Sequence, residues 1–209
     1  MDTNTNNSVD YQKSYFRQYA IDGLLGLLLP ILVVWQCGKV PSSISYSYYI
    51  GAAVPFVFVM GNLGVTFFCN HGFKGVTFLL NRPFTNVDKI CNRITGLASL
   101  CVIFFPCNSP KYAFNCIPYP DIHYASAVLL FATFSFMCLF VFTQIRSSFG
   151  ATKQKKMRNI IYRMFGVFIL LAMIAIGLKL VTVFWGEVAM LLGYGIPYLI
   201  QGKIILRDK

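Results

Sequence analysis

A short basic segment between two long apolar runs constrains this chain more than any other feature. Residues 145–163 contain no acid and six cations, Arg146, Lys153, Lys155, Lys156, Arg158 and Arg163. The flanking runs, 122–145 and 160–181, are long enough to cross a bilayer. Lys and Arg resist translocation, so a short basic loop between two spanning helices stays on the cytoplasmic side. The segment therefore predicts a multi-pass membrane protein and sets the orientation of its helices.

The composition agrees with a membrane protein. Of the 209 residues, 56% are hydrophobic and only 12% are charged, whereas soluble domains carry about 25% charged residues. A formal net charge of +11 could indicate nucleic-acid binding. Here, however, the cations lie beside the apolar runs, on the side predicted to be cytoplasmic. We therefore expect anionic lipid headgroups, and not nucleic acid, as partners of this charge.

Six apolar runs predict six transmembrane helices in a single domain, 1–209. They cover residues 20–36, 45–69, 90–106, 122–145, 160–181 and 184–204. The third run is short, but without it the two basic segments would lie on opposite sides of the membrane. The prediction is an all-α integral protein of the plasma or inner membrane, a bundle of six helices with both termini cytoplasmic.

Three of these helices begin with similar residues. FRQYAIDG occupies 16–23, NRITG occupies 92–96 and YRMFG occupies 162–166. An Arg near the inner face followed by a glycine suggests three repeated helical hairpins. The alternative is that topology places the Arg in each case and that glycine is common in membrane helices.

A polar cluster is expected at the outer face. Asp121 and His123 lie at the start of the fourth helix and Glu187 at the start of the sixth. Carboxylates beside an imidazole can transfer a proton or hold a metal. The simpler interpretation is that Asp121 caps a helix, while Glu187 is stabilised by the helix dipole or pairs with Lys179 across the turn.

On the inner side, Asp22 is an acid one turn inside the first helix. Arg93 and Arg163 are expected at the same depth. A buried acid is costly without a partner, so an ion pair from Asp22 to one of these arginines is favoured over a gating or transport role.

Prolines and glycines indicate bent helices that could border a cavity. The residues expected to line it are Pro55, Asn62, Gly193, Gly195, Pro197 and Gln201. Irregular backbone at membrane depth is tolerated where it lines a cavity. The alternatives are a bend without a cavity for the glycines and proline, and interhelical hydrogen bonds for Asn62 and Gln201.

The seven cysteines include no C-x-x-C pair, so they support neither a thiol-redox enzyme nor a zinc site. Cys107 and Cys116 both fall in a predicted outer loop, where a disulfide can form. Two free thiols are the alternative. No metal or cofactor is expected.

No nucleophile elbow, P-loop, H-E-x-x-H or dinucleotide fingerprint is present. The favoured hypothesis is a non-enzymatic channel, transporter or binding protein for a lipid or small molecule, with a cavity between bent helices 20–36, 45–69 and 184–204, functioning as a homo-oligomer. The alternative is a membrane enzyme that acts on a lipophilic substrate at Asp121, His123 and Glu187. A third hypothesis is a membrane anchor that recruits a cytoplasmic protein through the basic loops.

Overall fold

The computed structural model describes residues 3–49, 51–69, 86–107, 120–144 and 152–206. These residues form six α-helices and no strand. The helices are α1 (Thr3–Cys37), α2 (Ala53–Cys69), α4 (Asn86–Phe104), α5 (Pro120–Phe136), α6 (Lys153–Gly177) and α7 (Val183–Gln201). A 3₁₀ turn, Ser45–Tyr49, precedes α2, and a π-helical turn, Met137–Val141, extends α5. The all-helical prediction is confirmed.

Four segments are long and apolar enough to cross a membrane. They are Phe16–Cys37, Pro120–Val141, Lys153–Gly177 and Val183–Gln201. A further apolar helix, Ala53–Phe68, is shorter. The described residues therefore contain four helices compatible with a membrane, where the sequence predicted six.

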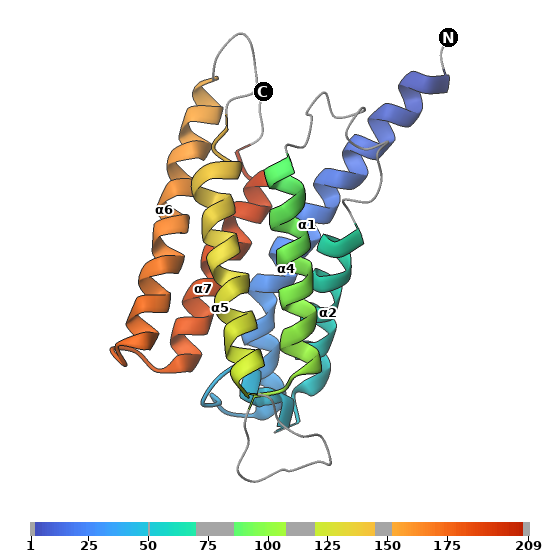
Figure 1. Cartoon of the computed structure of the whole chain (residues 1–209). Helices are drawn as coiled ribbons and strands as arrows, with labels where there is room; N and C mark the ends of the chain where they lie inside the picture. The colour runs from blue at the N-terminus through green and yellow to red at the C-terminus, as the bar shows by residue number, and fades with distance from the viewer. Residues whose placement is uncertain (1–2, 50, 70–85, 108–119, 145–151, 207–209) are drawn as a thin grey trace.

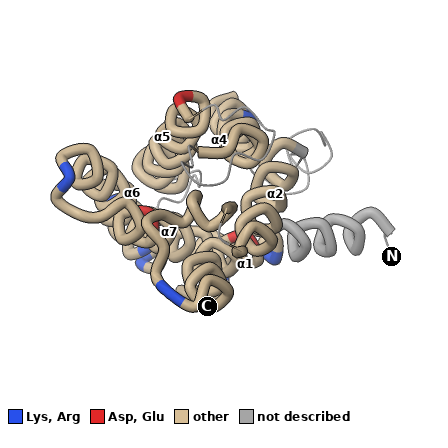
Figure 2. Tube along the Cα trace, turned by 90° about the horizontal axis from the view of Figure 1, so that it is seen from below, with Lys and Arg blue, Asp and Glu red and all other residues tan. Residues whose placement is uncertain are grey.

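The helices stand side by side and run alternately up and down (Figure 1). We call the end where α1 begins and α7 ends the terminal end, and the opposite end the turn end. In space the helices follow the order α1, α2, α4, α5, α6 and α7, and α7 packs against α1. Figure 2 shows this closed ring along its axis.

Aromatic side chains fill the middle of the ring. Phe134 and Tyr194 stack with their centroids 4.2 Å apart, and Tyr198 lies 4.3 Å from Tyr194. Phe67 and Tyr19 contact the same Tyr198 ring at 5.7 and 5.3 Å. Both Tyr194 and Tyr198 are completely buried. These rings pack together and fill the centre of the bundle at this level.

Glycines allow three of the helices to approach closely. A Cβ on Gly195 of α7 would lie 2.8 Å from the carbonyl oxygen of Gly23 in α1. A Cβ on Gly193 would lie 2.5 Å from Cγ1 of Ile169 in α6. Gly193 and Gly195, expected to border a cavity, instead lie in packed helix contacts of the kind small residues permit in membranes.

The predicted helix 45–69 is divided in two. Gly51 adopts a left-handed φ of +98°, a conformation that glycine adopts without steric cost. The α-helix starts only at Ala53, so Pro55 lies in the first turn and not in the middle of a span. A proline is tolerated there because the first N–H groups of a helix have no intrahelical acceptor. Pro55 therefore produces no mid-span kink.

Two helices begin before the predicted spans for a common reason. The first helix begins at Thr3 and α6 begins at Lys153, whereas hydropathy placed their starts at 20 and 160. Part of the basic segment is therefore helix, and the Thr152 side chain caps it by accepting a hydrogen bond from the Lys155 N–H. Hydropathy detects only the apolar part of a helix. A polar extension into water stays helical because it keeps the same backbone hydrogen bonds, but its hydropathy is low.

Candidate functional site

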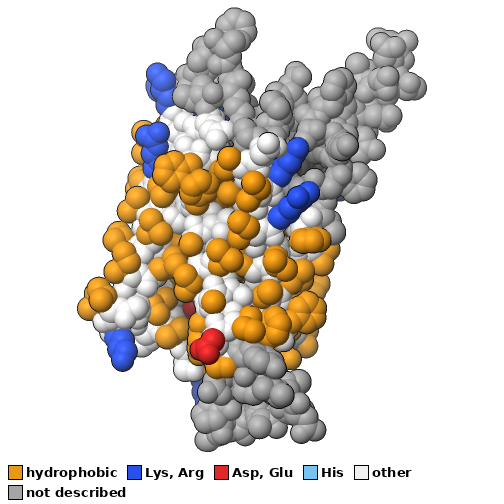
Figure 3. Space-filling model, viewed as in Figure 1, with side chains coloured by type: hydrophobic (Ala, Val, Ile, Leu, Met, Phe, Trp, Pro, Cys, Tyr) orange, Lys and Arg blue, Asp and Glu red, His pale blue; other side chains and the backbone are white. Residues whose placement is uncertain are grey.

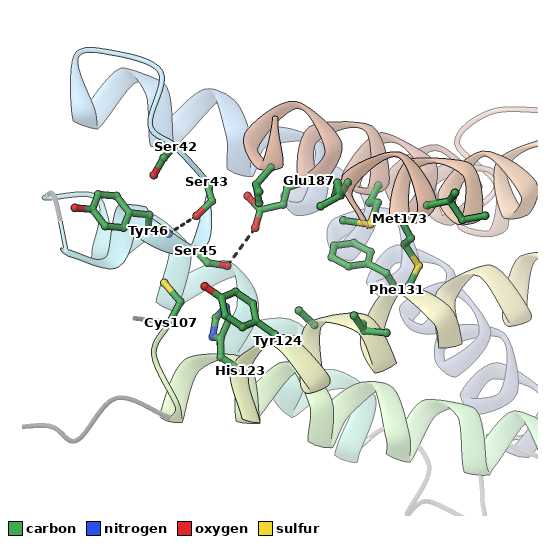
Figure 4. Close-up of a pocket in the computed structure, with 16 residues that line it drawn as sticks. Ser42, Ser43, Ser45, Tyr46, Cys107, His123, Tyr124, Phe131, Met173 and Glu187 are labelled. Carbon is green, nitrogen blue, oxygen red and sulfur yellow. Dashed lines mark hydrogen bonds between the residues drawn. The ribbon is translucent and has the colours of Figure 1, made fainter. Parts of the chain in front are cut away.

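A cavity of about 660 Å³ lies at the turn end of the bundle. It is bordered by α5, α6, α7 and residues 38–52, which we call the connecting segment (Figure 4). Its polar lining consists of Ser42, Ser43, Ser45, Tyr46, Cys107, His123, Tyr124 and Glu187. Most of the remaining lining is aliphatic or aromatic, including Phe131, Met173 and Met190.

Glu187 fastens the connecting segment to α7. Its Oε2 accepts a hydrogen bond from the backbone N–H of Ile44, and its Oε1 accepts one from the Ser45 hydroxyl at 3.3 Å. The N–H of Phe184 adds a bond to the Ser42 carbonyl at 3.2 Å. The predicted pair with Lys179 is not formed, because Glu187 points to the connecting segment while Lys179 lies exposed in the turn.

His123 joins α5 to the end of α4. Its Nδ1 lies 3.1 Å from the carbonyl oxygen of Val102 and 2.9 Å from that of Phe105. Both oxygens can only accept, so this network assigns the proton to Nδ1. In the neutral ring, Nε2 is then the nitrogen that can accept a hydrogen bond. The ring is buried, with 2% of its surface exposed, and it lines the cavity.

Asp121 does not belong to this site. It is exposed and absent from the cavity lining, whereas His123 is buried. Two residues along an α-helix turn the side-chain direction by about 200°, so Asp121 and His123 point to opposite sides of α5. Of the three residues predicted to cluster, His123 and Glu187 line one cavity and Asp121 does not. No group of three or more potential metal ligands occurs among the described residues.

Several lining residues were not predicted. Figure 4 shows the Tyr124 hydroxyl pointing into the cavity from α5. The serines and Tyr46 come from SSISYSYY at 42–49, which hydropathy divides between a loop and a spanning helix. Its density of hydroxyl groups was the available signal, because a lipid-facing helix seldom carries so many.

Cys107 lies at the edge of the cavity with its side chain buried. Burial, assisted by the nearby Glu187 charge, raises its pKa to about 11. The thiol is therefore protonated at neutral pH and a poor nucleophile. Its predicted disulfide partner, Cys116, lies outside the described residues, so that bond stays a prediction.

The acid in the other half of the bundle has neutral partners. Asp22 Oδ1 accepts hydrogen bonds from Gln18 Nε2 at 3.0 Å and from Asn62 Nδ2 at 3.3 Å. Arg93 and Arg163 are exposed. The predicted ion pair is therefore not formed: Asp22 faces α2, and the arginines lie on outward-facing positions where their long side chains can reach the aqueous interface.

The other residues predicted to line a cavity serve contacts between helices. Gln201 accepts a hydrogen bond from the Tyr162 hydroxyl at 3.1 Å, which links α6 to α7. Asn62 links α2 to α1 through Asp22. Pro197 is buried inside an uninterrupted α7. None of the six lines the 660 Å³ cavity.

Comparisons with protein-family models, curated proteins and solved structures give no match for this chain.

Proposed function

We propose that this chain is a multi-pass membrane protein that binds a small lipophilic molecule in the cavity at the turn end. In this proposal all six helices cross the plasma or inner membrane as three hairpins, and the terminal end is cytoplasmic. The basic start of α6, from Lys153 to Arg158, and Lys203 after α7 lie at the terminal end. The positive-inside rule then supports a cytoplasmic terminal end in contact with anionic lipids, and an outer turn end.

One observation carries the proposal. The cavity of about 660 Å³ has a mainly apolar wall and a small set of polar groups gathered on one side. Small-molecule sites typically occupy about 300–1,000 Å³ and have this kind of lining. An apolar molecule with one polar end would satisfy both parts of the wall.

Binding is favoured over conduction because the aromatic rings around Tyr194 and Tyr198 close the centre of the bundle. A channel or transporter would need those rings to move.

Binding is also favoured over catalysis. The Glu187 carboxylate already accepts hydrogen bonds from Ile44 and Ser45, and no hydrogen bond joins it to His123 in the described structure. A general base is expected within hydrogen-bond reach of its proton donor or of substrate. An enzyme acting on a lipophilic substrate is the second candidate, since His123 and Glu187 do share one cavity. Turnover of a lipid by the purified protein, lost in His123→Ala, would favour that candidate.

The binding proposal can be tested by photolabelling. The protein is placed in lipid nanodiscs with a long-chain alkyl diazirine, and labelled peptides are mapped. We expect labels on the lining of α5 and α6, and Ala127→Trp should reduce them by about tenfold, because filling the cavity removes at least about 1.4 kcal/mol of binding free energy. Leu171→Trp is the matched control, because Leu171 is exposed on α6 outside the cavity. Equal labelling of folded Ala127→Trp and wild type would contradict the proposal.

A further inference from the structure

Accepting the proposed binding function, we infer that the ligand is a cationic amphiphile, an amine with a single apolar chain. It enters from the outer leaflet between α5 and α6 and places its ammonium group against Glu187. Three features of the cavity support this inference: where it opens, what charge it contains and how its polar and apolar walls are arranged.

The helices α5 and α6 are in close contact near mid-membrane. The Ser135 hydroxyl donates to the Gly166 carbonyl at 2.8 Å, and a Cβ on Gly166 would lie 2.7 Å from Cγ of Leu139. From this contact α5 continues back toward Pro120 and α6 continues on toward Gly177, and the cavity lies between them at that end. The two helices thus close the inner part of the interface and leave its outer part open.

The mouth of the cavity faces sideways. Tyr124 and Val128 of α5 and Ile174 of α6 line the cavity, yet 55%, 56% and 56% of their surfaces are exposed. All three lie in segments long and apolar enough to cross a membrane. Figure 3 shows this side of the molecule, where apolar side chains cover both helices. The opening therefore faces lipid, and a molecule dissolved in the outer leaflet can reach it without crossing water.

When Glu187 is ionised, the described part of the cavity lining carries a net negative charge. Among the described lining residues Glu187 is the one Asp or Glu, and none of them is a Lys or Arg. An ionised carboxylate accepts at about four lone-pair sites. The Ile44 N–H, the Ser45 hydroxyl and the Ser45 N–H occupy three of them. Removing a carboxylate from water without a cation beside it is costly. An ammonium group provides both the missing charge and a donor for the remaining site.

Other headgroups fit less well. A carboxylate or phosphate would bring a second negative charge beside Glu187, and no Lys or Arg among the described lining residues would offset it. An alcohol can donate one hydrogen bond but leaves the charge uncompensated. The expected order of affinity is therefore amine, then alcohol, then acid.

The walls also set the orientation of the ligand. His123, Tyr124 and the connecting segment place polar groups at the turn end, while Phe131 lies two turns deeper, about 12 Å along α5. Met173 and Met190 complete the deep apolar part, and the flexible methionine side chain adapts to chains of different shape. The headgroup therefore lies at the outer interface and the chain points toward mid-membrane, as in an outer-leaflet lipid.

The test uses competitors that differ only in headgroup. Dodecylamine, dodecanol and dodecanoate compete with the alkyl diazirine for wild-type protein in nanodiscs of neutral lipid. We expect the amine to compete about tenfold better than the alcohol and the acid to compete least, a difference of about 1.4 kcal/mol between amine and alcohol. Glu187→Gln should abolish the preference for the amine and leave competition by the alcohol unchanged. Asp121→Asn, which removes an exposed carboxylate at the same end, should leave the whole series unchanged.

The outcomes separate the two proposals. Equal competition by all three compounds would retain the binding site and overturn the headgroup assignment. Absence of saturable labelling would overturn the binding function itself. If Glu187→Gln still preferred the amine, Glu187 would not be the residue that binds the ammonium group.

A second measurement needs no substitution. Dodecylamine with a diazirine near the nitrogen should label residues 42–46, and the same amine with a diazirine at the chain end should label the peptides containing Phe131 and Met190. Reversed labelling would overturn the orientation.

Discussion

Two acids, the buried Asp22 and the half-buried Glu187, lie in different halves of the bundle and have different surroundings. Asp22 accepts hydrogen bonds from the side chains of Gln18 in α1 and Asn62 in α2. Glu187 accepts them from Ile44 and Ser45 in the connecting segment. Neither acid forms an ion pair in the described part of the chain, so the chemistry of the carboxylate alone does not distinguish a structural acid from a binding one.

The space around the two acids does distinguish them. Next to Asp22, Gly23 brings α1 into backbone contact with Gly195 of α7. Glu187 borders the 660 Å³ cavity and also a smaller one of about 30 Å³, large enough for a water molecule. Asp22 lines neither cavity. We therefore assign Asp22 to helix association and Glu187 to ligand binding, and three predictions test this comparison.

The largest effect is expected at the α1–α7 contact. In Gly23→Leu the new Cβ would lie 2.7 Å from the Gly195 carbonyl oxygen and 3.0 Å from the Leu199 nitrogen, both backbone atoms. Because neither atom can rotate away, we expect destabilisation of about 3 kcal/mol or more and loss of monodisperse protein. Size-exclusion chromatography and thermal melting would measure it.

Gly177→Leu is the control for that substitution, since a Cβ there meets nothing within 4 Å. If Gly23→Leu melted like Gly177→Leu, the tight packing of the Asp22 half would be refuted.

The next effect concerns the Asp22 network. Asp22→Ala removes the acceptor shared by the half-buried side-chain amides of Gln18 and Asn62, and leaves Gln18 only its hydrogen bond to Thr66 Oγ1 at 3.3 Å. The loss should be about 1–3 kcal/mol. Asp121→Ala, at an exposed carboxylate, should change stability little. The comparison with Glu187 is sharpened if Asp22→Ala lowers the melting temperature while photolabelling of the cavity in the folded fraction stays at the wild-type level.

The sequence allowed the composition-dependent features to be predicted. Long apolar runs predict membrane helices because their length and hydropathy can be read from the sequence. Four of the described helices are long and apolar enough to cross a membrane. The break at Gly51 was missed, because a left-handed glycine between apolar residues leaves hydropathy unchanged. The polar helical extension at Lys153 was missed for a similar reason.

The depth of the site residues along their helices was predictable from the sequence, but the rotation of each helix about its own axis was not. His123 and Glu187 were expected near the same face of the membrane, and they line one cavity. The rotation of each helix about its axis decides which of Asp121 and His123 points inward, and whether Asp22 meets an arginine or an amide. That rotation is set by contacts such as Gly23 with Gly195 and Ser135 with Gly166. Such contacts join residues far apart in sequence, so the periodicity of apolar residues along the chain does not reveal them.

The smallest effect is expected where Glu187 holds the connecting segment. Ser45→Ala removes the hydroxyl that donates to Oε1 at 3.3 Å and leaves the Ile44 N–H bond in place. A hydrogen bond this long should contribute less than about 1 kcal/mol, so the amides of residues 44–47 should exchange hydrogen only a few-fold faster. Ser42→Ala is the matched control, because Ser42 holds α7 through its backbone carbonyl and not through its side chain.

This last comparison isolates the role of the carboxylate. If Ser45→Ala accelerates exchange slightly and raises affinity for dodecylamine, the hydroxyl and the ammonium group compete for the same oxygen of Glu187. If exchange in Ser45→Ala increases as much as in Glu187→Ala, the hydroxyl, and not the backbone N–H, carries the attachment of the segment. Glu187 would then be a structural acid like Asp22, and the contrast between the two halves of the bundle would disappear.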